Sequence, residues 1–379
     1  MYFQLSEEHL MIQQAARDFA QTELKPGVIE RDEHQKFPAE QIKKLGELGF
    51  LGMMVDPKYN GAGMDTISYV LVMEELSKID ASASVVVSVN NSLVCYGLEY
   101  FGSEEQKEKY LKPLAAGEQI GAFCLSEPEA GSDATSQHTT AVDMGDYYLL
   151  NGTKNWITNG GNASTYLVIA QTHPEKGSHG INALIVEKGM EGFTIGPKEN
   201  KLGIRGSDTH SLMFSDVKVP KTNRIGEDGF GFKFAMKTLE GGRIGIAAQA
   251  LGIASGAFEL ATQYAKERKT FGKPIANHQA IAFKLADMAT EIEAARLMVL
   301  KAAWLKDQGL PYAQASSMAK LYASEVAMKT TVEAVQIHGG YGFVKEFHVE
   351  RLMRDAKITQ IYEGTSEIQK VVISREILK

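Results

Sequence analysis

The middle of the chain carries a different pattern from both ends, and this contrast constrains the fold most. Between about Gly121 and Ile225 the signals are those of short strands separated by Gly, Pro and Asp, with no helical pattern between them. We interpret Asn151-Gly152 as a hairpin turn after the first of these strands. Such strands predict a compact antiparallel barrel or sandwich and not a parallel sheet. The predicted strands are Tyr147–Leu150, Tyr166–Ala170, Ile181–Val186 and Leu212–Val219.

The first third of the chain is predicted to be helical. Ser6 and Asp65 stand where helix N-caps are expected, and Pro38 opens a further helix. Ser103 and Gln106 have the spacing of a capping box. This third therefore indicates a set of helices that build a core.

The last third returns to helix. Gly309-Leu310-Pro311 interrupts it, and a further helix is predicted from Gln314 to about His338. Apolar residues recur at spacings of four and three, which is typical of a seam between antiparallel helices in a bundle. They are Ile281, Leu285, Met288, Ile292, Ala295, Val299 and Ala302. We therefore predict three domains, with the boundaries 1–120 (helical), 121–225 (β) and 226–379 (helical bundle).

Composition excludes several functional classes. A chain of 379 residues with 44% apolar content can bury more than one core. The net charge of −7 argues against nucleic acid or an anionic membrane as the main partner. Cys95 and Cys124 predict neither a disulfide framework nor a zinc site, and no metal is expected. Residues 1–8 lack the pattern of a signal peptide, and no run of about 18 apolar residues predicts a membrane span. A reducing cytoplasm is the expected compartment.

The segment Ile361–Glu367 is the strongest candidate for chemistry. Gly364 is predicted to end one helix and Thr365-Ser366 to cap the next, which leaves Glu363 at a break between helices. A carboxylate held there can act as a general base. The alternative is a solvated helix end, since a Glu before a capping Gly is common. The chain has no GxGxxG after a strand, no Walker loop and no GxSxG, which disfavours a nicotinamide-binding unit and a serine hydrolase.

Three further stretches can contact a ligand, and each has a simpler interpretation. Cys124–Ala134 is rich in small, hydroxyl and acidic residues that suit a polar ligand, or it is a plain interdomain loop. Trp156–Gly160 can place an indole beside a planar ring, or Trp156 is a core residue. Gln336–Gly342 ends a helix in glycines that admit a phosphate or ring, or that only stop the helix.

Taken in this order, these stretches resemble the acyl-CoA dehydrogenase family over essentially the whole chain. Cys124–Ala134 and Gln336–Asp355 are similar to the two signature patterns of that family, and Ile361–Glu367 to the segment that holds its catalytic base. The resemblance implies an N-terminal α-helical domain, a middle β domain and a C-terminal four-helix bundle with FAD between them. It also implies a homotetramer built from two dimers, and an electron-transfer flavoprotein as the electron acceptor.

The resemblance further implies which residues contact FAD. Thr158 would hydrogen-bond the reactive edge of the isoalloxazine, and Arg268 would suit the pyrophosphate of a neighbouring subunit's cofactor. The segments around Arg268 and Gln336 would both reach across the subunit interface. The full set is Phe123, Leu125, Ser126, Gly131, Ser132, Trp156, Ile157, Thr158, Arg268, Phe271, Gln279, Gln336, Ile337, Gly339, Gly340, Thr365 and Glu367.

For the substrate, the resemblance implies that Glu363 removes the α proton of an acyl thioester while flavin accepts the β hydride. Water exclusion should raise the pKa of Glu363 by about two to three units. Relatives that place the base just before the arginine of Leu239–Arg243 carry Glu there, whereas this chain has Gly242. Glu240 stands where the family has Asp. The implied substrate-binding residues are Ser132, Glu240, Arg243, Gln249, Thr359 and Gly364.

Gln249 and Thr359 match the positions that limit pocket depth in short-chain, butyryl-CoA enzymes, so four-carbon chains are the expected substrates. Discrimination against one extra methylene group of the acyl chain is worth only about 1 to 3 kcal/mol, so we do not expect the enzyme to act on four-carbon chains alone. Other chain lengths or branched substrates are the alternative. An acyl-CoA oxidase usually has a long additional C-terminal region, and a flavin-bearing DNA-protection relative would carry a basic domain. A helical scaffold without flavin is the remaining alternative.

Overall fold

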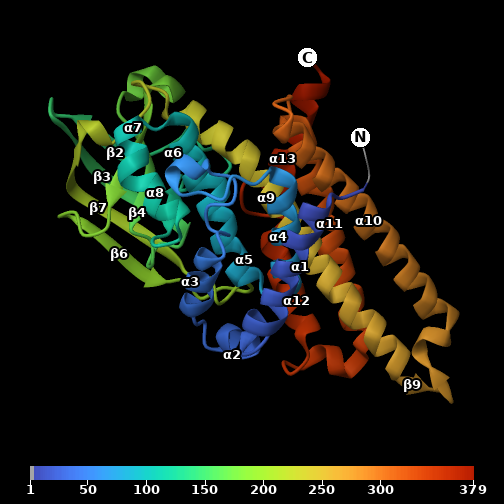
Figure 1. Ribbon diagram of the computed structural model, residues 1–379. Coiled ribbons are helices and arrows are strands. Elements are labelled where there is room, and N and C mark those ends of the chain that lie inside the picture. Colours follow the sequence, from blue (N-terminus) through green and yellow to red (C-terminus); the bar gives the residue numbers. More distant parts are fainter. Residues whose placement is uncertain (1–3) are drawn as a thin grey trace.

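The computed structural model describes residues 4–379, so residues 1–3, where the predicted N-terminal domain starts, lie outside it. The N-terminal part is helical, as predicted (Figure 1). The expected caps are present: Ser6 Oγ accepts from His9 N at 3.1 Å, and Asp65 accepts from Ser68 N at 2.7 Å. Its helices are α1 (Glu7–Phe19), α2 (Val28–Glu33), α3 (Ala39–Glu47), α4 (Thr66–Ile79), α5 (Ala81–Ser88), α6 (Tyr96–Phe101), α7 (Glu104–Gln106) and α8 (Lys112–Ala115).

The middle domain is a sheet in the strand order β6-β7-β3-β2-β4-β5-β8, with β1 paired to β4. Most pairings are antiparallel, as predicted, and β4 pairs in parallel with β1 and with the first residue of β2. The strands are β1 (Gly121–Cys124), β2 (Thr140–Asp143), β3 (Tyr147–Thr158), β4 (Thr165–Gln171), β5 (Ile181–Glu187), β6 (Phe193–Lys198), β7 (Thr209–Pro220) and β8 (Arg224–Ile225).

The predicted hairpin turn at Asn151-Gly152 is wrong. Both residues lie inside β3, at a shift in its register with β7. The Asn151 side chain accepts from Asp216 N at 2.8 Å and donates to Asp216 Oδ1 at 3.0 Å, which bridges the irregularity. Gly152 has φ +141°, and a Cβ there would lie 2.6 Å from Thr139 Cα. The dipeptide therefore forms a bulge, because the strand continues past it and pairs with β7 on both sides.

The C-terminal part is a helical bundle in which the long helix α9 packs against α4, α10, α11 and α12 (Figure 1). A short hairpin of β9 (Lys269–Thr270) and β10 (Lys273–Pro274) connects α9 to α10. The helix that Gly364 is predicted to end stops earlier, at Ile358, and turns follow it. The helices are α9 (Gly231–Glu267), α10 (Gln279–Asp307), α11 (Ala313–His338), α12 (His348–Ile358) and α13 (Ser366–Ile377).

Two helical stretches of the described chain are long and apolar enough to cross a membrane, although the sequence showed no uninterrupted apolar run. They are Ala81–Phe101, which runs from α5 through a π-helical segment to α6, and α9. The protein itself buries 94% and 83% of their most apolar windows, respectively. Both stretches therefore form the core where the N-terminal and C-terminal helices meet.

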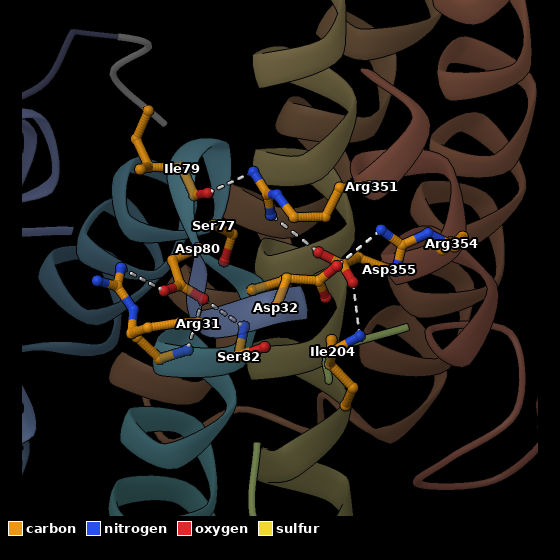
Figure 2. A network of polar contacts seen from close by, with 12 residues as sticks. Arg31, Asp32, Ser77, Ile79, Asp80, Ser82, Ile204, Arg351, Arg354 and Asp355 are labelled. Atoms are coloured by element: carbon orange, nitrogen blue, oxygen red, sulfur yellow. Dashed lines mark hydrogen bonds and ion pairs between the residues drawn. The ribbon is translucent and has the colours of Figure 1, made fainter. Parts of the chain in front are cut away.

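A buried polar network joins the three domains close to the segment that carries Glu363 (Figure 2). Asp355, on α12, accepts from the backbone N–H of Ile204 at 2.5 Å and from Arg351 Nη1 at 3.0 Å. Arg351 Nη2 donates to the carbonyl of Ile79, at the end of α4, at 2.8 Å. Because Ile204 belongs to the β6–β7 connection, α12 is hydrogen-bonded both to the N-terminal helices and to the sheet domain. The network therefore anchors α12 one turn before the segment that carries Glu363.

Candidate functional site

Glu363 lies in the turn between α12 and α13, at the break between helices that the sequence predicts. Its φ is +50° and that of Gly364 is +92°. A left-handed conformation costs a residue other than glycine about 1–3 kcal/mol, so the surrounding structure must hold it. Lys320 Nζ and Gln369 Nε2 donate to the Gly364 carbonyl at 2.6 and 2.8 Å. Thr365 caps α13 by accepting from the backbone N–H of Ile368, also as predicted.

The carboxyl group of Glu363 faces helix α9. Its Oε2 atom is buried and has no hydrogen-bond partner among the described residues. A Cβ built at Gly242 would lie 2.2 Å from that oxygen, so the carboxyl occupies the space that the glycine leaves. Burial raises the pKa of Glu363 to about 7, against the opposing effect of the Lys320 and Arg243 charges. A carboxyl with a free oxygen and a pKa near neutral is suited to accept a proton.

The charged residues of α9 near Gly242 are Glu240 and Arg243, and not all of the polar groups of Arg243 have hydrogen-bond partners. Arg243 is buried and donates from Nη1 to Ser317 Oγ at 3.3 Å, while its Nε has no partner among the described residues. Burial lowers the pKa of Arg243, and the charges of Glu240 and Glu363 oppose that shift. Glu240 is half-buried one turn before Arg243. An unsatisfied guanidinium N–H next to the carboxyl marks this face of α9 as suited to a polar ligand.

Gln249 and Thr359 are both fully buried. The Gln249 amide donates to the Ala81 carbonyl at 2.9 Å and accepts from the hydroxyl of Tyr362, the neighbour of Glu363. Thr359 Oγ1 donates to the Ala356 carbonyl at 2.7 Å. The structure thus connects Gln249 through Tyr362 to the turn that carries Glu363.

A second group of predicted residues lies where β1 and β3 end. The loop after β1 is held to β3 by Asn155 N, which donates to the Ser126 carbonyl at 2.9 Å, and by Lys154 Nζ, which donates to the Leu125 carbonyl at 3.0 Å. Lys154 also pairs with Glu127 at 2.7 Å in a fully buried ion pair. This brings Phe123, Leu125 and Ser126 together with Trp156, Ile157 and Thr158.

The backbone contact between Asn155 and Ser126 places the loop directly beside the last residues of β3. Trp156 stands out there, because its side chain is 57% exposed and its φ is +57° at a second register shift between β3 and β7. The core position considered for Trp156 is therefore wrong. Gly131 has open space around the position of a Cβ, and Ser132 beside it is exposed. An exposed aromatic in a strained conformation next to an open loop is suited to cover a flat ligand.

A third group lies at the far end of α9. Arg268, Ile337, Gly339 and Gly340 line one pocket of about 520 Å³, together with Tyr341, whose ring lies 5.7 Å from the Arg268 guanidinium. At 1.5 Å per helical residue, Arg268 is roughly 37 Å along α9 from Arg243, and Figure 1 shows this end of the bundle far from the sheet. Within one chain this pocket is therefore separate from the groups around Glu363 and Trp156.

Not every predicted contact joins a group. Phe271 is 95% exposed, at φ +50°, and Gln279 and Gln336 are exposed outside the lining of this pocket. Glu367 is exposed in the first turn of α13. These side chains are accessible on the surface of one chain.

Sequence reasoning missed two residues that shape the site. Lys320 is fully buried on α11, and the signal that could have found it is a lysine on a helix face made otherwise of small residues such as Ser317, Ala323 and Ser324. The sequence presents Gly242 only as the absence of a competing glutamate, whereas its missing side chain makes room for Glu363. Nothing local in the sequence indicates that contact, because the two residues are far apart along the chain.

Three family models match the chain. They are described as the acyl-CoA dehydrogenase N-terminal domain, at residues 6–118, middle domain, at residues 122–217, and C-terminal domain, at residues 229–378. The chain belongs to the acyl-CoA dehydrogenase family. It is an oxidoreductase that dehydrogenates acyl-CoA thioesters, and its helical, β and helical domains are those of the family.

Individual relatives are similar over their full length. A curated protein of Clostridium acetobutylicum, named acyl-CoA dehydrogenase, short-chain specific, is 52% identical over 379 residues, which is 100% of both chains. The solved butyryl-CoA dehydrogenase from Megasphaera elsdenii is 50% identical, with a TM-score of 0.99 and 100% of both chains covered. A chain in a solved structure described as the electron transferring flavoprotein of Acidaminococcus fermentans is 52% identical, also with a TM-score of 0.99 and full coverage of both chains.

Proposed function

We propose that this protein is a FAD-dependent short-chain acyl-CoA dehydrogenase that converts butyryl-CoA to crotonyl-CoA, with Glu363 as the base. The observation that carries the proposal is the Glu363 carboxyl, whose buried oxygen lacks a partner among the described residues and whose pKa is raised to about 7 by burial. A carboxylate in water would be a much weaker base for an α proton.

The residues present fit FAD. Gly131, Gly339 and Gly340 leave open space where a side chain would stand, and Trp156 offers an exposed ring beside Thr158. The Arg268 guanidinium in the distant pocket suits a pyrophosphate. When bound, FAD supplies the acceptor for the β hydride. The residues that would hold it are the loop Leu125–Ser132 and Trp156–Thr158 of one subunit, with Arg268 and Gln336–Gly340 of another.

The chain's own groups account for the removal of the proton. Glu363 Oε2 is free to accept the α proton, and its strained backbone is held through the next carbonyl by Lys320 and Gln369. The backbone N–H of Glu363 makes no hydrogen bond within the described residues, so it can polarise the thioester carbonyl and stabilise the enolate-like charge that develops on it. The burial of Oε2 keeps water from that oxygen atom.

The preference for short chains rests on Gln249. Its amide is held by α5 and by Tyr362, so it cannot swing aside without breaking buried hydrogen bonds. A fixed side chain at the end of the acyl site limits its depth, and Thr359 lies fully buried one turn before Glu363. The short-chain relative and the butyryl-CoA dehydrogenase relative support this assignment.

The distance between the Arg268 pocket and the Trp156 group supports an assembly in which one subunit completes the cofactor site of another, and we propose a homotetramer. The similar chain from Acidaminococcus fermentans, solved in a structure described as an electron transferring flavoprotein, supports such a protein as the electron acceptor. We place the enzyme in the cytoplasm, in either β-oxidation or butyrate formation.

The test is anaerobic mixing of the flavin-loaded protein with butyryl-CoA while the flavin absorbance is followed. The wild type should bleach, and Glu363→Gln should bleach about 10²- to 10⁴-fold more slowly. Glu376→Gln on α13, which loses only a surface pair with Lys379, is the matched control and should behave as the wild type. Wild-type bleaching rates in Glu363→Gln would overturn the assignment of the base.

A further inference from the structure

Helix α11 presents a line of buried polar residues to the Glu363 turn. Ser317, Lys320 and Ser324 are all fully buried, and they follow one another at spacings of three and four, which places them on one face. Ser317 accepts from Arg243, and Lys320 donates to Gly364. The face thus contacts both segments that enclose the Glu363 carboxyl.

Lys320 is the unusual member of this line. A lysine is almost never fully buried unless it is paired. The only hydrogen bond of Lys320 Nζ among the described residues is the one to the Gly364 carbonyl, at 2.6 Å, and no carboxylate oxygen of the described chain lies within salt-bridge distance of it. The protein therefore holds a cation inside the site without neutralising it by a direct ion pair.

Gln369 provides a neutral comparison at the same carbonyl. It is also fully buried, and its Nε2 donates to Gly364 O at 2.8 Å and to Glu363 O at 3.2 Å. Both side chains thus hold the same strained turn, but only Lys320 adds a charge. A comparison of Lys320 with Gln369 therefore distinguishes the effect of a hydrogen bond to the turn from the effect of a charge beside it.

We propose that Lys320 is a positioning residue for the dehydrogenation, which holds the Glu363 turn through the Gly364 carbonyl and adds its buried positive charge next to that turn. This inference rests on the proposed role of Glu363 as the base. Lys320 would thus give α11 a part in the reaction without contacting the substrate.

The titration of Glu363 follows from the groups around it. Burial raises its pKa, and Lys320 is the largest opposing influence, ahead of Arg243. Lys320 in turn has its pKa lowered to about 8 by burial, so it is still mostly protonated at pH 7. The other titratable groups facing these two residues are Tyr69, Tyr362, Glu325 and Glu367. Removal of the Lys320 charge must raise the pKa of Glu363 further, because the carboxylate loses an attractive partner.

The experiment compares Lys320→Met, Lys320→Gln and Gln369→Met in the flavin-loaded enzyme. In both Lys320 variants the acidic limb of the pH profile of kcat/KM should shift to higher pH by about one unit. On the acidic side of the limb, kcat/KM should be about tenfold lower than in the wild type, and it should recover at higher pH. Gln369→Met, which removes a neutral donor from the same carbonyl, should leave the limb in place. Lys320→Gln keeps a donor without the charge, and it carries the test if Lys320→Met does not fold.

A second readout needs no turnover. Infrared titration of the Glu363 carboxyl, isolated as the difference between each protein and its Glu363→Gln counterpart, should show the same upward shift in the Lys320 variants. An unshifted limb in Lys320→Gln, or an equal shift in Gln369→Met, would overturn the electrostatic role of Lys320. Full activity of Glu363→Gln would instead overturn the proposed function, so the two failures can be told apart.

Discussion

The space left by Gly242 gives the sharpest prediction. A Cβ at this position would lie 2.2 Å from Glu363 Oε2 and 2.7 Å from Leu93 Cδ2. Both distances are below ordinary van der Waals contact, and the carboxyl is the end of a flexible side chain, so it is the group that moves. Gly242→Ala should therefore displace the Glu363 carboxyl by about 1 Å, since carbon and oxygen cannot approach so closely.

The expected loss follows from that displacement. A misplacement of about 1 Å can cost roughly 10²-fold in rate, because the reacting atoms leave the geometry in which the proton is transferred. Helix propensity acts in the opposite direction, since alanine inside a helix is favoured over glycine by about 1 kcal/mol. We therefore expect a stable protein with kcat/KM for butyryl-CoA lowered about 100-fold.

The control is Gly241→Ala, on the same helix. A Cβ there has no neighbour closer than Lys306 Nζ at 3.9 Å, so the substitution gains the same helix propensity without the clash. Steady-state kinetics, flavin content and thermal midpoint should be measured for both variants. Wild-type kcat/KM in Gly242→Ala, or an equal loss in Gly241→Ala, would refute the reasoning.

The remaining predictions concern pH, chain length and the sheet. Because Glu363 must be ionised to act as a base and its pKa is raised to about 7, kcat/KM should fall about tenfold per unit as the pH drops below 7, and a limb near pH 4.5 in the pH–rate profile would contradict this. Gln249→Ala should raise the ratio of kcat/KM for hexanoyl-CoA over butyryl-CoA by about tenfold or more, and an unchanged chain-length profile would exclude Gln249 from the acyl pocket. Gly152→Ala should lower the thermal midpoint, because the clash with Thr139 adds an overpacking cost of about 1–3 kcal/mol. The control is Gly145→Ala, which also has a positive φ (+94°) but open space around the Cβ, and it should cost less. Equal midpoints of the two variants would exclude the clash as the cause.

Local signals in the sequence anticipated much of the fold. The caps at Ser6, Asp65 and Ser103 form as predicted, because a cap depends only on residues within one turn. The strand patterns and the break at Glu363 are also local, and both are confirmed. The Asn151-Gly152 prediction failed because the same dipeptide fits a turn or a bulge, and pairing with a distant strand decides between them.

The amino-acid sequence was enough to predict the order of helical, β and helical domains, the helix junction that holds Glu363, and the family resemblance that the comparisons confirm. It took the packed molecule to reveal that Gly242 makes room for the carboxyl and that Lys320 is buried beneath the same turn. Hydrogen-bond patterns within a turn or cap are determined by residues that are neighbours in the sequence. Burial and the pKa it shifts arise where distant segments pack, so they exist only once α9, α11 and the Glu363 turn have come together.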